Sequence, residues 1–304
     1  MVNKTSVNVG NNGFFYIFLY PQENLEPKFM QKTRVLYITQ EIVPFLPESE
    51  VSSTVRTLAQ GVHERDKEIR IFMPRFGVIN ERRHQLHEVI RLSGMNLIVN
   101  DVDHPLIIKV ASVPQARMQV YFIDNEEFFK RKRTYTDEDE NFFKDNDERA
   151  IFFCRGVVET VKKLGWTPDI VHCHGWMTGF LPLYLKKMYA DDPHFSNVKI
   201  IYTPYADEFS GNLDSKIIGK LNFDNITNED VDFLKTPNAL NLNKTGAQWA
   251  DAISIGSETI NSELSSYIND SGKPVLDYQT EETLVDTHQG FYEKVLSENG
   301  VLAD

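Results

Sequence analysis

The sequence predicts an α/β protein: a single three-layer, Rossmann-like, doubly wound sheet that carries a β-hairpin insertion. Two observations support this fold class. Short apolar runs rich in β-branched residues alternate with amphipathic segments whose apolar residues recur at helical spacing. The apolar runs also lack polar alternation, which is typical of parallel strands buried on both faces of a sheet.

The first strand–helix–strand unit spans residues 34–73. Arg34–Thr39 (RVLYIT) has the composition of a doubly buried strand, and Glu68–Met73 (EIRIFM) is expected to be the second strand. Between them, apolar residues at positions 51, 55, 58 and 62 follow helical spacing, so a helix is expected there. A unit of this kind is right-handed by default.

A β-rich insertion follows this unit. Gly94–Val99 and Leu106–Val113 flank the turn-forming cluster Asn100–Asp103, which predicts a hairpin. Gln119–Ile123 is expected to be a further strand. Residues 130–148 are dense in charge, which is typical of a solvated, mobile loop; a binding patch is the alternative.

The second half of the chain continues the alternation. Glu148–Leu164 predicts a long amphipathic helix that ends at Gly165. Residues 207–243 are polar and irregular, with short helical pieces at most. Further strands are expected at Ile170–Cys173, Lys199–Thr203 and Ala252–Ile255.

The stretch from Pro168 to Pro182 is the centre of the functional prediction. It predicts a strand, a tight turn at Gly175 and a helix from near Thr178 to about Tyr189, with the Thr178 hydroxyl as N-cap. Open α/β sheets bind ligands where strands end before helix N-termini, and such an N-terminus suits an anionic or hydroxyl-rich ligand. Many turns of this kind hold no ligand, so an empty turn is the alternative.

Two histidines occupy this strand. His172 and His174 are two residues apart, so both side chains point to one face and Cys173 points to the other. A zinc site needs a third ligand, and the sequence supplies none at a recognisable spacing. The motifs GxGxxG, GxxxxGK[ST] and GxSxG do not occur, so we expect neither a metal nor a cofactor. His174, nearest the turn, is either a satisfied core histidine or a ligand contact.

Charge and cysteine content limit the possible partners. The 304-residue chain carries 44 Asp and Glu against 32 Lys and Arg, a formal net charge of −12. A nucleic-acid duplex or an anionic membrane requires a basic surface, so both are excluded as main partners. Cys154 and Cys173 lie in apolar runs and give no disulfide framework, which favours a cytoplasmic setting.

Three segments are expected along the chain. Residues 1–29 are expected to be a disordered leader whose apolar run is too short to span a membrane, with Met30 as the true first residue. Residues 30–268 are expected to form the Rossmann-like domain. Residues 269–304 are expected to form a tail with a strand over Pro274–Tyr278 and a helix over Glu281–Leu296.

Five blocks of sequence resemble bacterial glycogen synthases and plant starch synthases, in the same order. The blocks are ITQEIVPF (38–45), VYFID (120–124), DNDERA (145–150), PDIVHCHGWMTG (168–179) and KTGAQWADAISIGSETINSEL (244–264). The resemblance implies the N-terminal half of a GT-B glucosyltransferase. Such enzymes transfer glucose from ADP-glucose to an α-1,4-glucan with retention of configuration.

The resemblance also implies which residues contact sugar. In this family the N-terminal domain mainly holds the glucan, and the C-terminal domain grips ADP-glucose. By position, sugar contacts are implied at His174, Asp145 and Glu41. Further sugar-binding positions are implied at Asn146, Trp176 and Tyr205. We assign no catalytic residue within the chain.

The chain departs from the family on the nucleotide side. The family has Lys-Thr-Gly-Gly-Leu, whose lysine offers a cation to the phosphates, where this chain has Pro-Glu-Ser-Glu-Val at 47–51. Two like charges about 4 Å apart repel by roughly 4 kcal/mol at an effective dielectric of 20, so a phosphate beside Glu48 is disfavoured. Gly175, Met177 and Tyr205 replace an aspartate and two histidines of the family blocks.

We therefore expect a glycogen/starch-synthase-like glucosyltransferase domain that is catalytically impaired alone, because the donor domain and the Lys-Thr-Gly-Gly-Leu loop are missing. A non-catalytic glucan-binding, regulatory or scaffold protein of glycogen metabolism is the alternative. The expected partners are an α-glucan or maltooligosaccharide, together with a second copy or a partner chain. The tail is expected to fold back onto the domain through Phe291 and Tyr292.

Overall fold

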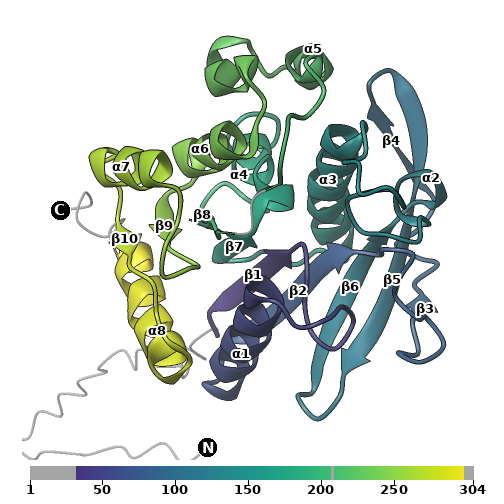
Figure 1. Ribbon diagram of the computed structural model, residues 1–304. Coiled ribbons are helices and arrows are strands. Elements are labelled where there is room, and N and C mark those ends of the chain that lie inside the picture. The colour runs from purple at the N-terminus through teal and green to yellow at the C-terminus, as the bar shows by residue number, and fades with distance from the viewer. Residues whose placement is uncertain (1–31, 207–208, 298–304) are drawn as a thin grey trace, which may run out of the picture. The chain divides into compact units, whose positions relative to one another are not determined.

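The computed structural model describes residues 32–206 and 209–297 (Figure 1), so the predicted leader and Met30 lie outside the described residues. The strands are β1 (Arg34–Thr39), β2 (Glu68–Pro74), β3 (His87–Glu88), β4 (Met95–Val99), β5 (Val102–Val113), β6 (Met118–Asp124), β7 (Ile170–His174), β8 (Lys199–Thr203), β9 (Ala252–Ser254) and β10 (Val275–Leu276). Among the described residues they form one sheet in the order β10-β9-β8-β7-β1-β2-β6-β5-β3, with β4 paired to β5.

All strand pairs from β10 to β6 are parallel. Every residue of β7 is buried, and β1 is buried from Val35 onward. A parallel strand is covered on both faces, which is why these strands are continuous apolar runs in the sequence. The predicted fold class is confirmed.

The hairpin insertion is also present. β4 and β5 pair antiparallel, and the two residues between them, Asn100 and Asp101, have φ values of 51° and 62°. A two-residue turn with positive φ at both positions matches the right-handed twist of its strands, and Asn and Asp tolerate that conformation. The turn is shorter than the expected cluster 100–103, because β5 already begins at Val102.

Helices cover both faces of the sheet (Figure 1). α1 (Glu50–Glu64) packs with α8 (Glu281–Ser297) on one face, and α3 (Asn146–Leu164), α4 (Leu181–Lys186) and α6 (Ala239–Trp249) cover the other. Right-handed crossovers give this division, because the chain moves from β1 to β2 in one direction and from β6 to β7 in the other. The shorter helices are α2 (Glu126–Phe129), α5 (Ile217–Asn222), α7 (Ser262–Asp270) and the 3-10 turns η1 (Trp176–Thr178) and η2 (Glu229–Lys235).

None of the helices in the described ranges has both the length and the apolar content needed to cross a membrane. The division of the chain at residue 268 stays a prediction.

The predicted N-cap at Thr178 is wrong. Thr178 ends η1, its hydroxyl donates to the Gly175 carbonyl over 2.7 Å, and α4 begins only at Leu181. The chain leaves β7 through Gly175 at a φ of 82° and makes a 3-10 turn before Pro182, which suits the first turn of a helix. α4 also ends at Lys186, before the expected Tyr189.

The charged segment 130–148 is not the fully solvated loop that its composition predicts, and its last three residues already belong to α3. Aromatic residues set between the charges turn inward, and Tyr135 and Phe142 pack on Trp176 with ring centroids 5.2 and 5.8 Å away. The charge density dominated the prediction, whereas the interleaved aromatic residues determine the position of the segment.

The expected return of the tail is confirmed. β10 pairs with β9, and Phe291 and Tyr292 of α8 are buried. The Tyr292 hydroxyl lies 2.7 Å from His172 Nδ1 and 3.0 Å from the Tyr37 hydroxyl. His172 Nε2 in turn lies 2.7 Å from the Thr203 hydroxyl, so the tail is hydrogen-bonded to β1 and β7 and, through His172, to β8.

Replacing Tyr292 with Phe tests this anchor. We expect the free energy of unfolding to fall by about 1–3 kcal/mol, because His172 Nδ1 loses its partner in a site without water access. Urea denaturation measures the change. The half-buried Tyr267 provides the matched control, and Tyr267→Phe is expected to cost far less; equal losses would contradict the anchor.

The buried histidines predict that the folded protein loses stability at acid pH. Burial lowers the pKa of His288 to about 4 and holds the pKa values of His172 and His174 well below the ordinary value. The unfolded chain binds protons at these histidines below about pH 6.5 and the folded chain does not, so stability is full above that pH and falls as pH decreases.

His288→Gln isolates one of these contributions. Each such histidine lowers the free energy of unfolding by about 1.4 kcal/mol at one pH unit below 6.5. We expect the variant to lose about that much less stability than the wild type between pH 7.5 and 5.5, measured by urea denaturation at both values. His87→Gln, which changes a histidine on the exposed strand β3, is the control variant.

Candidate functional site at the carboxyl edge of the sheet

The carboxyl ends of the parallel strands gather most of the predicted site residues at one edge. Glu41 follows β1, His174 ends β7 and Tyr205 follows β8. α1 begins at the same edge, after the loop 44–49. Ligands of open α/β sheets bind at this edge, because the loops and helix N-termini there leave polar groups facing a crevice.

Tyr135 links three of the predicted residues. Its hydroxyl donates to Glu41 Oε1 over 3.2 Å, and its carbonyl accepts from Asn146 Nδ2 over 2.9 Å. Its ring meets Trp176 at a 63° angle. Glu41 also accepts from the Ser49 hydroxyl over 2.7 Å, so its carboxylate is held from two sides. The only sequence signal for Tyr135 was an aromatic residue inside a charged run.

Asn146 is fully buried, and its other amide atom accepts from Arg149. Both ends of the amide are therefore occupied, and in this conformation Asn146 offers no atom to a ligand. Trp176 is 3% exposed and is packed among Tyr135, Phe142 and Phe209. These two residues support the walls of the site and do not form its surface.

Asp145 is held by Arg131. Both carboxylate oxygens accept from the guanidinium, at 2.7 and 2.5 Å. Burial alone would raise the pKa of Asp145, but the hydrogen bonds and charge of Arg131 outweigh it and keep the pKa below its ordinary value. Asp145 is therefore ionised at neutral pH, and a sugar hydroxyl would share this carboxylate with Arg131.

His174 and Tyr205 form a second, deeper pair. Both side chains are buried, and the Tyr205 hydroxyl lies 2.9 Å from His174 Nδ1. Burial is the largest cause that holds the pKa of His174 well below its usual range, so the imidazole is neutral. Its Nε2 has no hydrogen-bond partner among the described residues. The structure thus places His174 and Tyr205 together, apart from the residues linked by Tyr135.

Gly175 lies in the sequence between His174 of the deeper pair and Trp176 of the residues linked by Tyr135. At a φ of 82°, a Cβ at this position would lie 2.4 Å from Gln40 Oε1. That oxygen accepts from the Met177 backbone N–H over 3.2 Å and so holds the turn after β7. Any side chain at position 175 would displace Gln40 and strain the backbone.

The N-terminus of α1 is capped by its own side chains. Ser49 and Ser52 form a reciprocal capping box, with N···O distances of 3.1 and 2.7 Å. Glu50, in the first turn, accepts from the Ser257 hydroxyl. Glu48 lies exposed just before the cap. The positive end of the helix is therefore flanked by two carboxylates.

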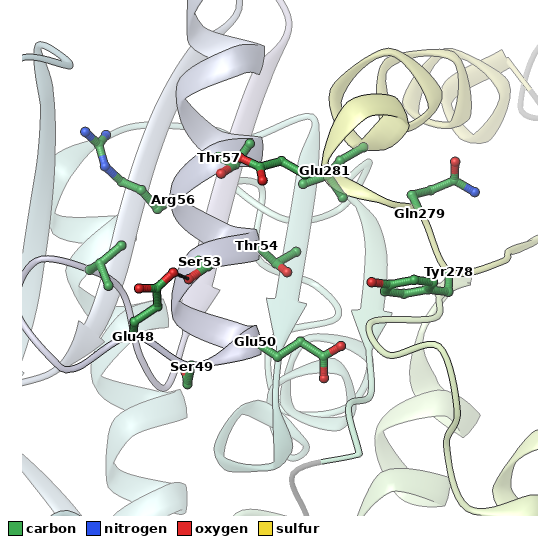
Figure 2. Close-up of a pocket in the computed structure, with 12 residues that line it drawn as sticks. Glu48, Ser49, Glu50, Ser53, Thr54, Arg56, Thr57, Tyr278, Gln279 and Glu281 are labelled. Atoms are coloured by element: carbon green, nitrogen blue, oxygen red, sulfur yellow. Dashed lines mark hydrogen bonds between the residues drawn. The ribbon is translucent and has the colours of Figure 1, made fainter.

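Two open depressions lie beside this helix start. One, of about 510 Å³, lies between α1 and residues 278–284 of the tail, and we call it the tail-side depression (Figure 2). The other, of about 470 Å³, lies between the loop 45–49 and residues 132–136 and includes Glu41. Within the described residues, no group of three or more His, Cys, Asp or Glu side chains could hold a metal ion.

The comparison with known proteins identifies the family. The profile of the starch synthase catalytic domain matches residues 34–275. This chain belongs to that family.

Curated relatives agree with this assignment. The glycogen synthase of Chlorobium limicola is 37% identical over 232 residues, which cover 76% of this chain and 47% of that protein. The glycogen synthase of Chlorobaculum tepidum is 36% identical over 227 residues, covering 74% of this chain and 46% of that protein. The starch-synthase-type chain therefore spans about half the length of the curated relatives it matches.

A solved structure shows the same fold. The catalytic domain of starch synthase IV from Arabidopsis thaliana, bound to ADP and acarbose, superimposes with a TM-score of 0.67 at 19% identity. It covers 82% of this chain, and this chain covers 52% of it. All six predicted sugar-binding residues lie inside the family match, whereas α8 and the residues before it from 276 onward lie beyond it.

Arg131→Gln tests the environment of Asp145. Loss of the cation should raise the pKa of Asp145, because the effect of burial is then opposed only by the charge of Arg149 and by a backbone hydrogen bond. Carbon-13 NMR titration of the carboxyl signal measures it. Arg133→Gln, which removes a nearby cation that does not bond to Asp145, is the matched control, and an equal shift in both variants would contradict the assignment.

Proposed function

We propose that this chain is a glycogen/starch-synthase-type glucosyltransferase domain that holds an α-glucan and does not, by itself, clamp the phosphates of a sugar nucleotide. Membership of the starch synthase catalytic-domain family supports the transferase lineage. The Arabidopsis relative, whose structure contains ADP and acarbose, supports a nucleotide and a glucan-like sugar as ligand classes of this fold family.

The start of α1 supports the proposal that this chain does not, by itself, clamp the phosphates of a sugar nucleotide. A helix N-terminus binds phosphate through free N–H groups and its positive dipole. Here the Ser49–Ser52 capping box occupies the N–H groups of Ser49 and Ser52, and Glu48 and Glu50 place negative charge at the same point. Transfer with a phosphate leaving group requires that developing charge be stabilised, and this arrangement opposes it.

The remaining polar groups suit a neutral polyol. Glu41 and Asp145 are ordered carboxylates at the carboxyl edge, and carboxylates accept strong hydrogen bonds from hydroxyls. We propose them as glucan contacts. His174 belongs to the same site by lineage, and in this conformation the tail leaves only a chamber of about 10 Å³ beside it, too small for a sugar ring. That closure supports the second candidate, a glucan-binding protein of glycogen metabolism without transferase activity.

Calorimetry with maltoheptaose and with ADP-glucose tests the proposal on the same preparation. We expect measurable maltoheptaose binding, ADP-glucose binding at least tenfold weaker, and no transfer of glucose to glycogen by the chain alone. Turnover of ADP-glucose at an ordinary enzymatic rate of about 1 per second or more would overturn the proposed impairment. Absence of maltoheptaose binding would overturn the glucan-holding role.

Glu48→Lys tests the electrostatic argument. Glu48 is exposed, so its interaction with a phosphate is screened to about 1 kcal/mol or less, and reversal of the charge should strengthen ADP-glucose binding by up to about fivefold. Glu64→Lys at the other end of α1 makes the same change in net charge and is the control. Equal gains in both variants would point to net charge and not to this position.

A further inference from the structure

The tail forms one wall of the tail-side depression, and this wall lies outside the family match. The tail-side depression is lined on one side by α1 and on the other by Tyr278, Gln279, Glu281 and Leu284. Figure 2 shows Glu50 and Thr54 projecting from α1 toward the tail and the Tyr278 ring projecting back toward α1. The family match ends at residue 275, so the wall formed by the tail lies outside the match and the wall formed by α1 lies inside it.

The lining has the chemistry of a site for an uncharged, hydroxyl-rich molecule. Glu48, Glu50 and Glu281 supply carboxylate acceptors, and Arg56 is the cation among the residues that line it. A phosphate would meet net negative charge, and the described residues form no metal-binding group. Tyr278 is 37% exposed and presents a rigid, amphipathic ring, which is suited to the apolar face of a sugar.

A second observation points to a ligand at the inner end of the depression. A small chamber of about 10 Å³ shares Thr54, Tyr278, Gln279 and Leu284 with the depression, and His174 lines it. His174 is fully buried, and its Nε2 has no hydrogen-bond partner among the described residues. A buried polar atom without a partner is costly, so a group that reaches it gains a strong site.

The size of the chamber decides how much of a ligand can enter. About 10 Å³ is the lower limit for a single water molecule. A pyranose ring is therefore confined to the outer depression, and only one hydroxyl can extend past Tyr278 and Gln279 toward His174.

We propose that the tail-side depression is a subsite for an uncharged oligosaccharide, with Tyr278 as the stacking surface and Glu50 and Glu281 as hydroxyl acceptors. A single hydroxyl of the bound sugar reaches His174 Nε2 through the inner chamber. The ligand class rests on the proposed glucan-holding function. The position of the subsite does not rest on that function, because the tail residues that form one wall of the depression lie beyond the matched domain.

Calorimetry of the full chain with maltoheptaose, on four variants and the wild type, tests the subsite. We expect Tyr278→Ala to weaken binding about tenfold and Glu281→Gln about threefold, the magnitude of a central aromatic contact and of a rim contact. Tyr278→Phe should retain binding, because the ring and not the hydroxyl is used. Glu282→Gln, the neighbouring exposed carboxylate that does not line the depression, should bind like the wild type.

Each result separates the two proposals. Unchanged binding in both Tyr278→Ala and Glu281→Gln, with normal binding by the wild type, overturns the subsite and leaves the glucan-holding function in place. Failure of the wild type to bind maltoheptaose overturns both. Tyr278 and Glu281 are exposed, and thermal unfolding of each variant identifies any loss of fold; Glu281→Gln then provides the decisive result if Tyr278→Ala is unstable.

Discussion

A buried chain of hydrogen bonds holds the carboxyl edge of this sheet together. It runs from Tyr37 on β1 to Tyr292 on α8, then to His172 on β7 and Thr203 on β8. Each of these polar groups would be costly to bury alone, and together they are satisfied. Because this series of hydrogen bonds includes Tyr292 of α8, the tail packs as part of the domain and forms part of the wall of the site.

The same edge combines a family scaffold with a changed charge pattern. The strands, the His174 turn and the Asp145 helix start match the starch synthase catalytic domain. At the start of α1 the Ser49 side chain caps the Ser52 N–H and carboxylates flank the helix end, so the local charge disfavours an anion. Fold and lineage therefore agree with transferase descent, and the carboxylates at the start of α1 are the basis of the proposed preference for a neutral polymer.

The strands were predictable because a buried parallel strand must be a continuous apolar run, as in RVLYIT and IVHCH. Turn details were less predictable. Thr178 has the chemistry of an N-cap, but the turn at Gly175 and the position of Pro182 moved the helix start by three residues. The segment 130–145 was predicted from its charge, although its aromatic residues pack inward on Trp176.

Local patterns in the chain were sufficient for the fold class, the order of strands along the sequence and the residue types at the functional edge, because these depend on periodicity and on short motifs. Tertiary packing determined which of these side chains contact one another. Tyr135 joins Glu41 to Asn146, Arg131 takes Asp145, and the tail encloses His174. The Tyr37–Tyr292 hydrogen bond joins residues 255 positions apart, and no local pattern encodes such a distance; only the folded sheet brings the two residues together.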